Sequence, residues 1–146
     1  MVRLATPGDA DEVARLLVAF RDHMGLSQPS AERFRANARL LIDDPHTDFL
    51  LGGEPAAGVC QLRYRHCVWL DAGDCTLEDL YVAEPVRGSG LGRALVDAAI
   101  ERARERGCAR VVLDANEENR AAISLYEAAG FSSGAGSRDL FLRRRV

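Results

Sequence analysis

The residues with the clearest chemical potential form a glycine-rich segment from Arg87 to Arg93. This segment follows an apolar, strand-like run, Leu77 to Val82, and opens a helical pattern, Leu91 to Arg106. Alternate glycines leave backbone N–H groups uncovered, and a helix start adds unpaired N–H groups and the positive end of the helix dipole. Together these features form a seat for phosphate, to which Arg87 can add a bidentate charged contact.

Two common phosphate loops do not fit this segment. The dinucleotide fingerprint G-x-G-x-x-G and the P-loop G-x-x-x-x-G-K-[ST], read from Gly88, both need a glycine where Arg93 stands. The P-loop also needs a lysine, and all 19 positively charged side chains of this chain are arginine. What remains is the pattern R-x-x-G-x-G, formed by Arg87, Gly90 and Gly92.

This pattern resembles the pyrophosphate-binding segment of the GNAT family of N-acetyltransferases, which transfer an acetyl group from acetyl-coenzyme A to an amine. Residues 119–131, NRAAISLYEAAGF, match the family's last conserved helix, N-x-x-A-x-x-L-Y-x-x-x-G-F. Leu77 to Val82 looks like the family's central strand, and Ala109 to Asp114 looks like the strand after the long helix. The resemblance therefore covers about residues 75 to 131 with all spacings intact.

The resemblance implies that acetyl-coenzyme A is the co-substrate and indicates which residues hold it. The glycine-rich segment would bind the pyrophosphate, and the backbone of the central strand would pair with the pantetheine arm as another strand would. An amide of the same strand would stabilise the oxyanion, and Asn119 would both cap its helix and touch the cofactor. The cofactor-binding residues expected on this basis are Leu80, Tyr81, Val82, Arg87, Gly88, Ser89, Gly90, Leu91, Gly92, Arg93 and Asn119.

Tyr126 occupies the position of the family's general acid. A phenol of pKa about 10 that faces a thiol of pKa about 8.5 can protonate the departing sulfur with a small penalty. The alternative is a core tyrosine that packs with Ala122, Leu125 and Ala129 on one side of the helix. The family motif favours the catalytic interpretation.

Glu78 is the candidate base, because an alkylamine of pKa about 10.4 is neutral only about once in 2,500 molecules at pH 7. Strand alternation puts Glu78 and Asp79 on opposite faces unless a bulge intervenes, so one of them should face the acceptor cleft. Acids at this place resemble those of family members that act on polyamines. The alternative, equally weighted, is an ion pair with Arg63 or Arg65 of the neighbouring strand.

The elements that position these residues alternate along the chain. Periodicity and turn residues predict strands at 2–5, 48–51, 57–70, 75–82, 109–114 and 139–143, and helices at 7–24, 31–43, 91–106 and 119–130. Thr6 is the expected cap of the first helix, with Pro7 at its first position. The order implies one α/β domain over residues 1–146. By resemblance, its central mixed, mostly antiparallel sheet is splayed between strands 4 and 5 and flanked by about four helices.

Composition is that of an ordinary globular protein, with 47% apolar and 28% charged residues. A net charge of −3 does not favour nucleic-acid binding, and no apolar run is long enough to cross a membrane. The four cysteines lack C-x-x-C spacing, which predicts reduced, mostly buried thiols in a cytoplasmic protein and no metal site. Members of the family often dimerise through their late strands, so a homodimer is a possible oligomeric state that the sequence does not decide.

These observations predict an N-acetyltransferase that passes the acetyl group directly to a primary amine, without a covalent enzyme intermediate. The expected acceptor is a small or polyamine-like molecule. Two alternatives stay open: acetylation of a peptide N-terminus or protein side chain, and a non-catalytic module that senses acetyl-coenzyme A.

Overall fold

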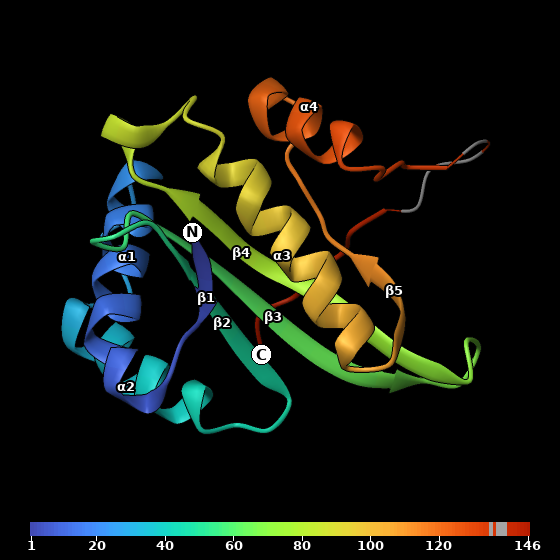
Figure 1. The fold of residues 1–146 in the computed structure, drawn as a ribbon, viewed down its shortest axis with the longest axis horizontal. Helices are drawn as coiled ribbons and strands as arrows, with labels where there is room; N and C mark the ends of the chain where they lie inside the picture. The colour runs from blue at the N-terminus through green and yellow to red at the C-terminus, as the bar shows by residue number, and fades with distance from the viewer. Residues whose placement is uncertain (135, 137–139) are drawn as a thin grey trace. The chain divides into compact units, whose positions relative to one another are not determined.

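The computed structural model describes residues 1–134, 136 and 140–146, and its strands form a mixed sheet in the order β1-β2-β3-β4-β5 (Figure 1). Neighbours pair antiparallel from β1 to β4, and β4 pairs with β5 in parallel. The result is the expected α/β fold with a mostly antiparallel sheet. The elements are β1 Val2–Leu4, α1 Ala10–His23, α2 Ala31–Ile42, β2 Thr47–Gly52, β3 Gly58–Cys67, β4 Ala72–Val82, α3 Leu91–Glu105, β5 Cys108–Val112 and α4 Arg120–Ala128.

The chain divides into two compact units, Met1–Asp114 and Ala115–Val146. The whole sheet and α1, α2 and α3 belong to the first unit, whereas α4 belongs to the second. That residues 1–146 act as a single domain stays a prediction.

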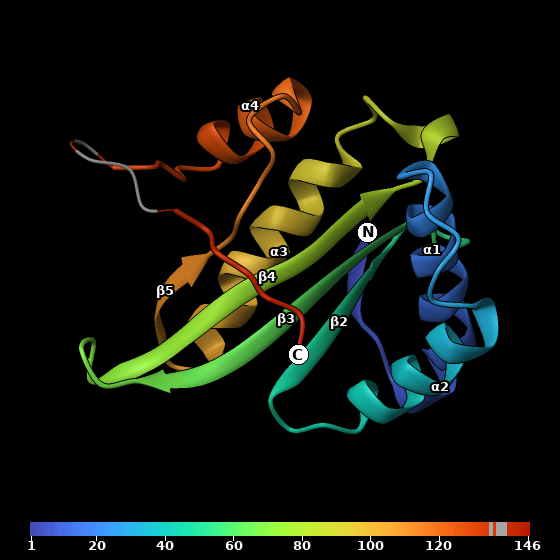
Figure 2. The same cartoon turned by 180° about the vertical axis from the view of Figure 1, so that it is seen from behind.

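Alternating side chains of the strands build a core on each face of the sheet in the first unit. On β2, Leu50 packs in the cluster that includes Leu95 of α3, whereas Phe49 and Leu51 pack in the cluster of α1 and α2. Figures 1 and 2, seen from opposite sides, show α3 along one face of β3 and β4 and α1 and α2 toward the other end of the unit. The turn between β4 and α3 therefore leads from the sheet to the helix that covers one of its faces.

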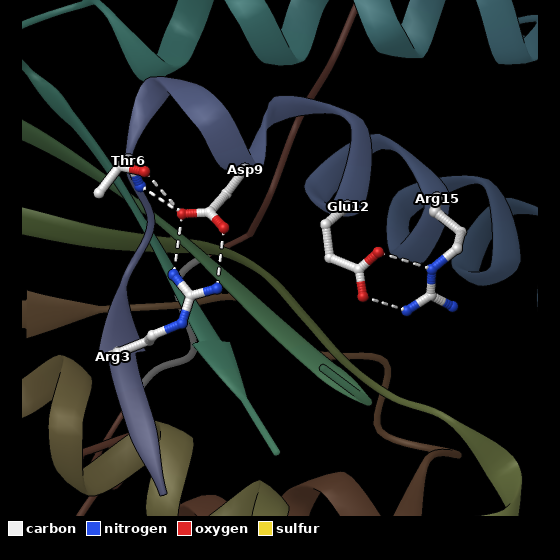
Figure 3. A network of polar contacts seen from close by, with 5 residues as sticks. All are labelled: Arg3, Thr6, Asp9, Glu12 and Arg15. Atoms are coloured by element: carbon white, nitrogen blue, oxygen red, sulfur yellow. Dashed lines mark hydrogen bonds and ion pairs between the residues drawn. The ribbon is translucent and has the colours of Figure 1, made fainter. Parts of the chain in front are cut away.

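The first helical segment has the expected cap at Thr6 and Pro7 at its first position, but its first turn is not α-helical. Pro7–Asp9 forms a short 3₁₀ helix, and the α-helix itself starts at Ala10. Asp9 accepts hydrogen bonds from the amide and the hydroxyl of Thr6, at 2.8 and 2.9 Å, and a bidentate contact from Arg3 at 2.8 Å (Figure 3). These donors hold the pKa of the Asp9 carboxyl well below its usual range.

The hairpin between β3 and β4 turns earlier than the pattern predicts. β3 ends at Cys67, not at residue 70, and β4 starts at Ala72, inside the predicted turn. The turn occupies residues 68–71, where Asp71 adopts a left-handed backbone with φ 47°. An Asp side chain tolerates this conformation better than most, which lets a short turn replace the expected one.

Other expectations at the chain's end and surface have mixed outcomes. The strand expected at 139–143 is wrong for residues 140–143, which form no strand, while residue 139 lies outside the described residues. Within the described residues, no helix is long and apolar enough to cross a membrane. The four cysteines are free and three are buried, as predicted.

Candidate active site

The predicted phosphate seat is a turn between β4 and α3 with open space above it. A 3₁₀ helix, Glu84–Val86, leads into it, and Gly88 and Gly90 then have φ values of 77° and 89°. A Cβ atom added at either glycine would meet no heavy atom within 4 Å. Gly90 is the N-cap of α3, and no side chain in the described structure caps that helix. The first backbone N–H groups of α3 are therefore not covered by side chains at the two glycines, as binding of an oxyanion requires.

Arg87 is already oriented by the end of β4. Its Nε donates to the Val82 carbonyl at 3.0 Å, and its guanidinium lies 5.8 Å from the centre of the Tyr81 ring. Nε is one of five N–H donors on the planar guanidinium, so this anchor leaves donors in a fixed plane. The side chain is exposed beside the turn, where a diphosphate could meet it.

The side chains of Ser89 and Arg93, two other predicted cofactor-binding residues, form local hydrogen bonds. The Ser89 hydroxyl donates to the Val86 carbonyl at 2.7 Å, which tightens the turn. Arg93 donates through Nε to both carboxylate oxygens of Asp97, one helical turn further along α3. That Ser89 and Arg93 also contact the cofactor stays a prediction.

The second half of β4 has one open edge among the described residues. Leu80, Tyr81 and Val82 pair with Cys60, Val59 and Gly58 of β3, but the pairing of β4 with β5 ends at Thr76 and Val112. The main-chain groups of residues 77–82 on the β5 side consequently have no strand partner there. An extended ligand could pair with this edge by main-chain hydrogen bonds. Splaying of the two strands is a separate prediction that pairing alone does not establish.

Tyr81 contributes its backbone to this edge while its side chain belongs to the core. Its ring stacks on Phe20 of α1 with centroids 5.4 Å apart, and the ring of His23 lies 6.3 Å away. The side chain is 8% exposed. Its packing fixes the strand direction immediately before the glycine-rich turn.

A β-bulge changes the predicted arrangement of the two carboxylates. Leu77 pairs with Leu62 and Asp79 with Gln61, which leaves Glu78 as an extra residue without a partner opposite it. Simple alternation therefore does not hold at this point of β4. Glu78 is exposed, whereas Asp79 is half-buried.

The environment of Asp79 raises its pKa. Burial is the main cause, and the negative charges of Glu78 and Asp114 add to it. A carboxylate with a raised pKa is a stronger base than an ordinary surface acid as long as it stays ionised. Sequence reasoning left Asp79 as the alternative base, and it could not show that a bulge interrupts the alternation of faces at Glu78.

The arginines expected to neutralise Glu78 bind other acids. Arg63 lies 3.7 Å from Asp44, and Arg65 lies 2.8 Å from the buried Asp74. The structural alternative for Glu78, an ion pair with Arg63 or Arg65, therefore lacks its proposed partners. What remains is an exposed carboxylate at a strand irregularity.

Asn119 and Tyr126 lie in the second unit. The Asn119 side chain accepts a hydrogen bond from the amide of Ala122 at 3.2 Å, which confirms it as the N-cap of α4. The ring of Tyr126 makes an edge-to-face contact with Phe131, with centroids 5.9 Å apart. The helix ends before Gly130, whose φ is 94°. The structure thus gathers the turn and the β4 acids in one unit and these two residues in the other.

Cys60 and Cys75 offer no reactive thiolate. Burial raises the pKa of Cys75 to about 12 and raises that of Cys60 further. Both thiols therefore stay protonated at neutral pH, in keeping with packing rather than nucleophilic catalysis. No group of three or more His, Cys, Asp or Glu side chains among the described residues could hold a metal ion.

Comparison with known proteins agrees with the geometry. Residues 12–131 match the family model of the acetyltransferase (GNAT) family. The chain is 29% identical over 144 residues to thialysine N-epsilon-acetyltransferase of Bos taurus, covering 89% of this chain and 82% of that protein. It is 50% identical over 140 residues to mycothiol acetyltransferase of Thermobispora bispora, covering 90% of this chain but 46% of that protein. The chain thus spans less than half of this relative's length.

A solved structure shares the fold over the whole chain. It belongs to a protein of Arthrobacter sp. FB24 assigned to the acetyltransferases, with 32% identity, a TM-score of 0.91 and coverage of 100% of this chain and 96% of that one. The family match covers most of the sequence, including the glycine-rich turn and the helix of Tyr126. The chain therefore belongs to the GNAT acetyltransferase family and is an acetyl-coenzyme A-dependent N-acetyltransferase.

Proposed function

We propose that the chain transfers an acetyl group directly from acetyl-coenzyme A to the primary amine of a small molecule. The observation that carries this proposal is the uncovered turn at Gly88 and Gly90, placed directly after a β4 edge that has no strand partner among the described residues. A phosphate seat and an extended pairing edge in this order suit a ligand that has a diphosphate at one end and an amide-containing arm at the other.

The residues of the first unit fit this co-substrate. The amides of residues 88–93 would bind the pyrophosphate, with Arg87 adding charge. Leu80, Tyr81 and Val82 would pair with the pantetheine arm through their main chain, and one of their amides would stabilise negative charge on the thioester oxygen. Acetyl-coenzyme A supplies the activated acetyl thioester, so the protein needs to orient it and manage protons.

Proton transfers would be carried out by a carboxylate of β4 and by Tyr126. Glu78, or Asp79 beside it, would take a proton from the attacking ammonium, directly or through water, so that nitrogen can bond to the acetyl carbon. As the carbon–sulfur bond breaks, Tyr126 would donate a proton to the departing sulfur. Asn119 would orient α4 as its cap and touch the cofactor.

The acceptor is inferred from charge and from relatives. The negative charges of Glu78 and Asp114 both act on Asp79, so a cationic acceptor would be attracted to this part of β4. The thialysine N-epsilon-acetyltransferase similarity supports an amine on a small side chain as the acceptor. Free, buried thiols support a cytoplasmic location. A homodimer remains open.

An amine panel tests this proposal. The full chain is mixed with acetyl-coenzyme A and, side by side, with thialysine-like amino acids, polyamines and short peptides, and thiol release is followed. We expect release with at least one small amine and a much lower rate with peptides. Faster release with peptides would favour the protein-directed alternative. Coenzyme A binding without release for any amine would favour the sensor alternative.

A further inference from the structure

A recess separate from the candidate active site lies in the first unit, at the end of the β3–β4 hairpin. It has a volume of about 560 Å³, within the range of small-molecule sites. The residues that matter for its chemistry come from β3, from the loop before β2 and from the segment after α3: His46, Tyr64, His66, Arg106 and Cys108. None of these residues belongs to the predicted acetyl-transfer site.

The recess is remote from the glycine-rich turn. That turn caps the N-terminus of α3, whereas Arg106 and Cys108 directly follow its C-terminus. A helix of 15 residues spans about 22 Å at about 1.5 Å per residue. The two places are therefore separate sites joined by one rigid element.

Arg106 is held in position at the rim of the recess. Its guanidinium lies 4.3 Å from the centre of the Tyr64 ring, and its Nη2 donates to the Pro45 carbonyl at 2.5 Å. The Tyr64 hydroxyl donates to Asp48, which fixes the ring beneath the guanidinium. A stacked arginine loses little side-chain entropy when it gains a further hydrogen bond, which favours recognition of an oxyanion.

Two imidazoles face the same space. His46 is fixed by its amide, which donates to the Asp44 carboxylate at 2.9 Å, and His66 lies near the end of β3. Both residues are exposed. Each imidazole can donate a hydrogen bond in either charge state, so the recess offers donors from three separate chain segments.

No carboxylate is among the residues that line the recess within the described structure. The nearby acids already have partners: Asp48 pairs with Arg102 at 2.7 Å, and the buried Asp74 pairs with Arg110 and with Arg65, which also lines the recess. Asp44 accepts from the His46 amide and lies 3.7 Å from Arg63. Burial raises the pKa of the Cys108 thiol, which therefore adds no negative charge.

The helix dipole of α3 opposes anion binding at the recess, but its free-energy contribution is small. The C-terminus of α3 carries the negative end of the helix dipole, which is worth about 0.3–1 kcal/mol at an exposed site. Arg102 and Arg104 near that end of the helix pair with Asp48, Glu105 and Glu101. The positive charge of Arg106 is the one that offsets the dipole at the recess.

We propose that this recess binds a small organic oxyanion that carries phosphate or carboxylate groups. Arg106, His46 and His66 would donate to its oxygens, and the Tyr64 ring would support the guanidinium. A bound metal ion is a poor alternative, because no suitable group of three ligands occurs among the described residues.

The NMR signals of the histidine rings provide a direct readout of anion binding, since the full chain has only three histidines. The chain with isotope-labelled histidine is titrated at constant pH and ionic strength with inorganic phosphate, and separately with citrate. We expect saturable shifts of His46 and His66 with at least one probe, and the lower saturating concentration distinguishes a phosphate site from a carboxylate site. His23, near Tyr81, reports on the distant turn.

Arg106→Gln should weaken the anion affinity measured at His46 and His66 roughly tenfold, because one charged donor is lost. Arg104→Gln is the matched control, since its guanidinium pairs with Glu101 on the helix surface at 3.1 Å. If Arg106→Gln lowers the melting temperature so far that the chain unfolds, His66→Gln replaces it, with His46 as reporter. Shifts that grow linearly without saturation, or equal affinities in the native chain and both arginine variants, would overturn the proposal.

Discussion

At the scale of single residues, Tyr126 is the sharpest test of the proposed chemistry. Its hydroxyl is the group that would protonate the leaving sulfur, and general acid catalysis typically contributes a factor of about 10² or more. Tyr126→Phe should therefore lower kcat by roughly 10²-fold while the affinity for coenzyme A, measured by calorimetry, changes less than about twofold.

The matched control for Tyr126 is Tyr64→Phe. The Tyr64 hydroxyl bonds to Asp48 and lies in β3, so its loss should reduce stability slightly and leave kcat near the native value. Equal turnover in Tyr126→Phe and the native chain would remove Tyr126 from the mechanism.

Glu78 and Asp79 form a coupled pair whose roles can be separated by pH. Glu78→Gln should lower kcat/KM by roughly 10- to 100-fold if Glu78 is the base. The same change removes a negative charge that raises the pKa of Asp79, so any acid limb that Asp79 causes should move to lower pH. The measurement is the pH profile of kcat/KM for Glu78→Gln and for Asp79→Asn. Full activity in Glu78→Gln together with inactivity in Asp79→Asn would reassign the base to Asp79.

At the scale of elements, the start of the first helical segment depends on the ionised form of Asp9. Since its folded pKa lies below the ordinary value, its contribution to stability is present above the unfolded pKa of about 3.9 and is lost as the pH falls below it. Asp9→Ala should lower the free energy of unfolding by about 1 kcal/mol at pH 7. The difference between the two chains should shrink below about pH 4, as measured by urea unfolding.

Glu12→Gln is the control for Asp9. Glu12 pairs with Arg15 at 2.7 Å but receives no backbone donor in the contacts that Figure 3 displays, so it acts as a surface ion pair. Its loss should change the free energy of unfolding by less than about 1 kcal/mol. If Glu12→Gln lowers the free energy of unfolding more than Asp9→Ala does, the stabilising role of Asp9 at the start of the helical segment is contradicted.

At the scale of the whole molecule, local patterns predicted the elements better than they predicted contacts between them. The glycines of the turn and the periodicity of α3 are local signals, and the structure confirms both. The bulge at Glu78 depends on hydrogen bonds to β3, whose residues lie some 16 positions earlier, so the strand sequence alone could not locate it. The role of Tyr126 was predicted from the family motif alone, because no local pattern links it to residues some 40 positions earlier in the sequence.

Ligand-linked stability tests the cofactor seat through the behaviour of the entire chain. A ligand that binds only the native state at about 100 times its Kd adds about 2.7 kcal/mol of stability. For a chain of 146 residues, this predicts a rise in Tm of roughly 5–10 °C with coenzyme A. Gly90→Val should abolish the rise, because a branched side chain would cover the amides of the turn.

Gly107→Val separates loss of binding from backbone strain. Gly107 has a φ of 74° with open space above it, as Gly90 does, but it follows the opposite end of α3. Both substitutions should lower Tm without ligand to a similar extent, since a side chain is strained at positive φ. Only Gly107→Val should keep the rise with coenzyme A. A rise of the same size in Gly90→Val would show that the cofactor binds the chain elsewhere than at this turn.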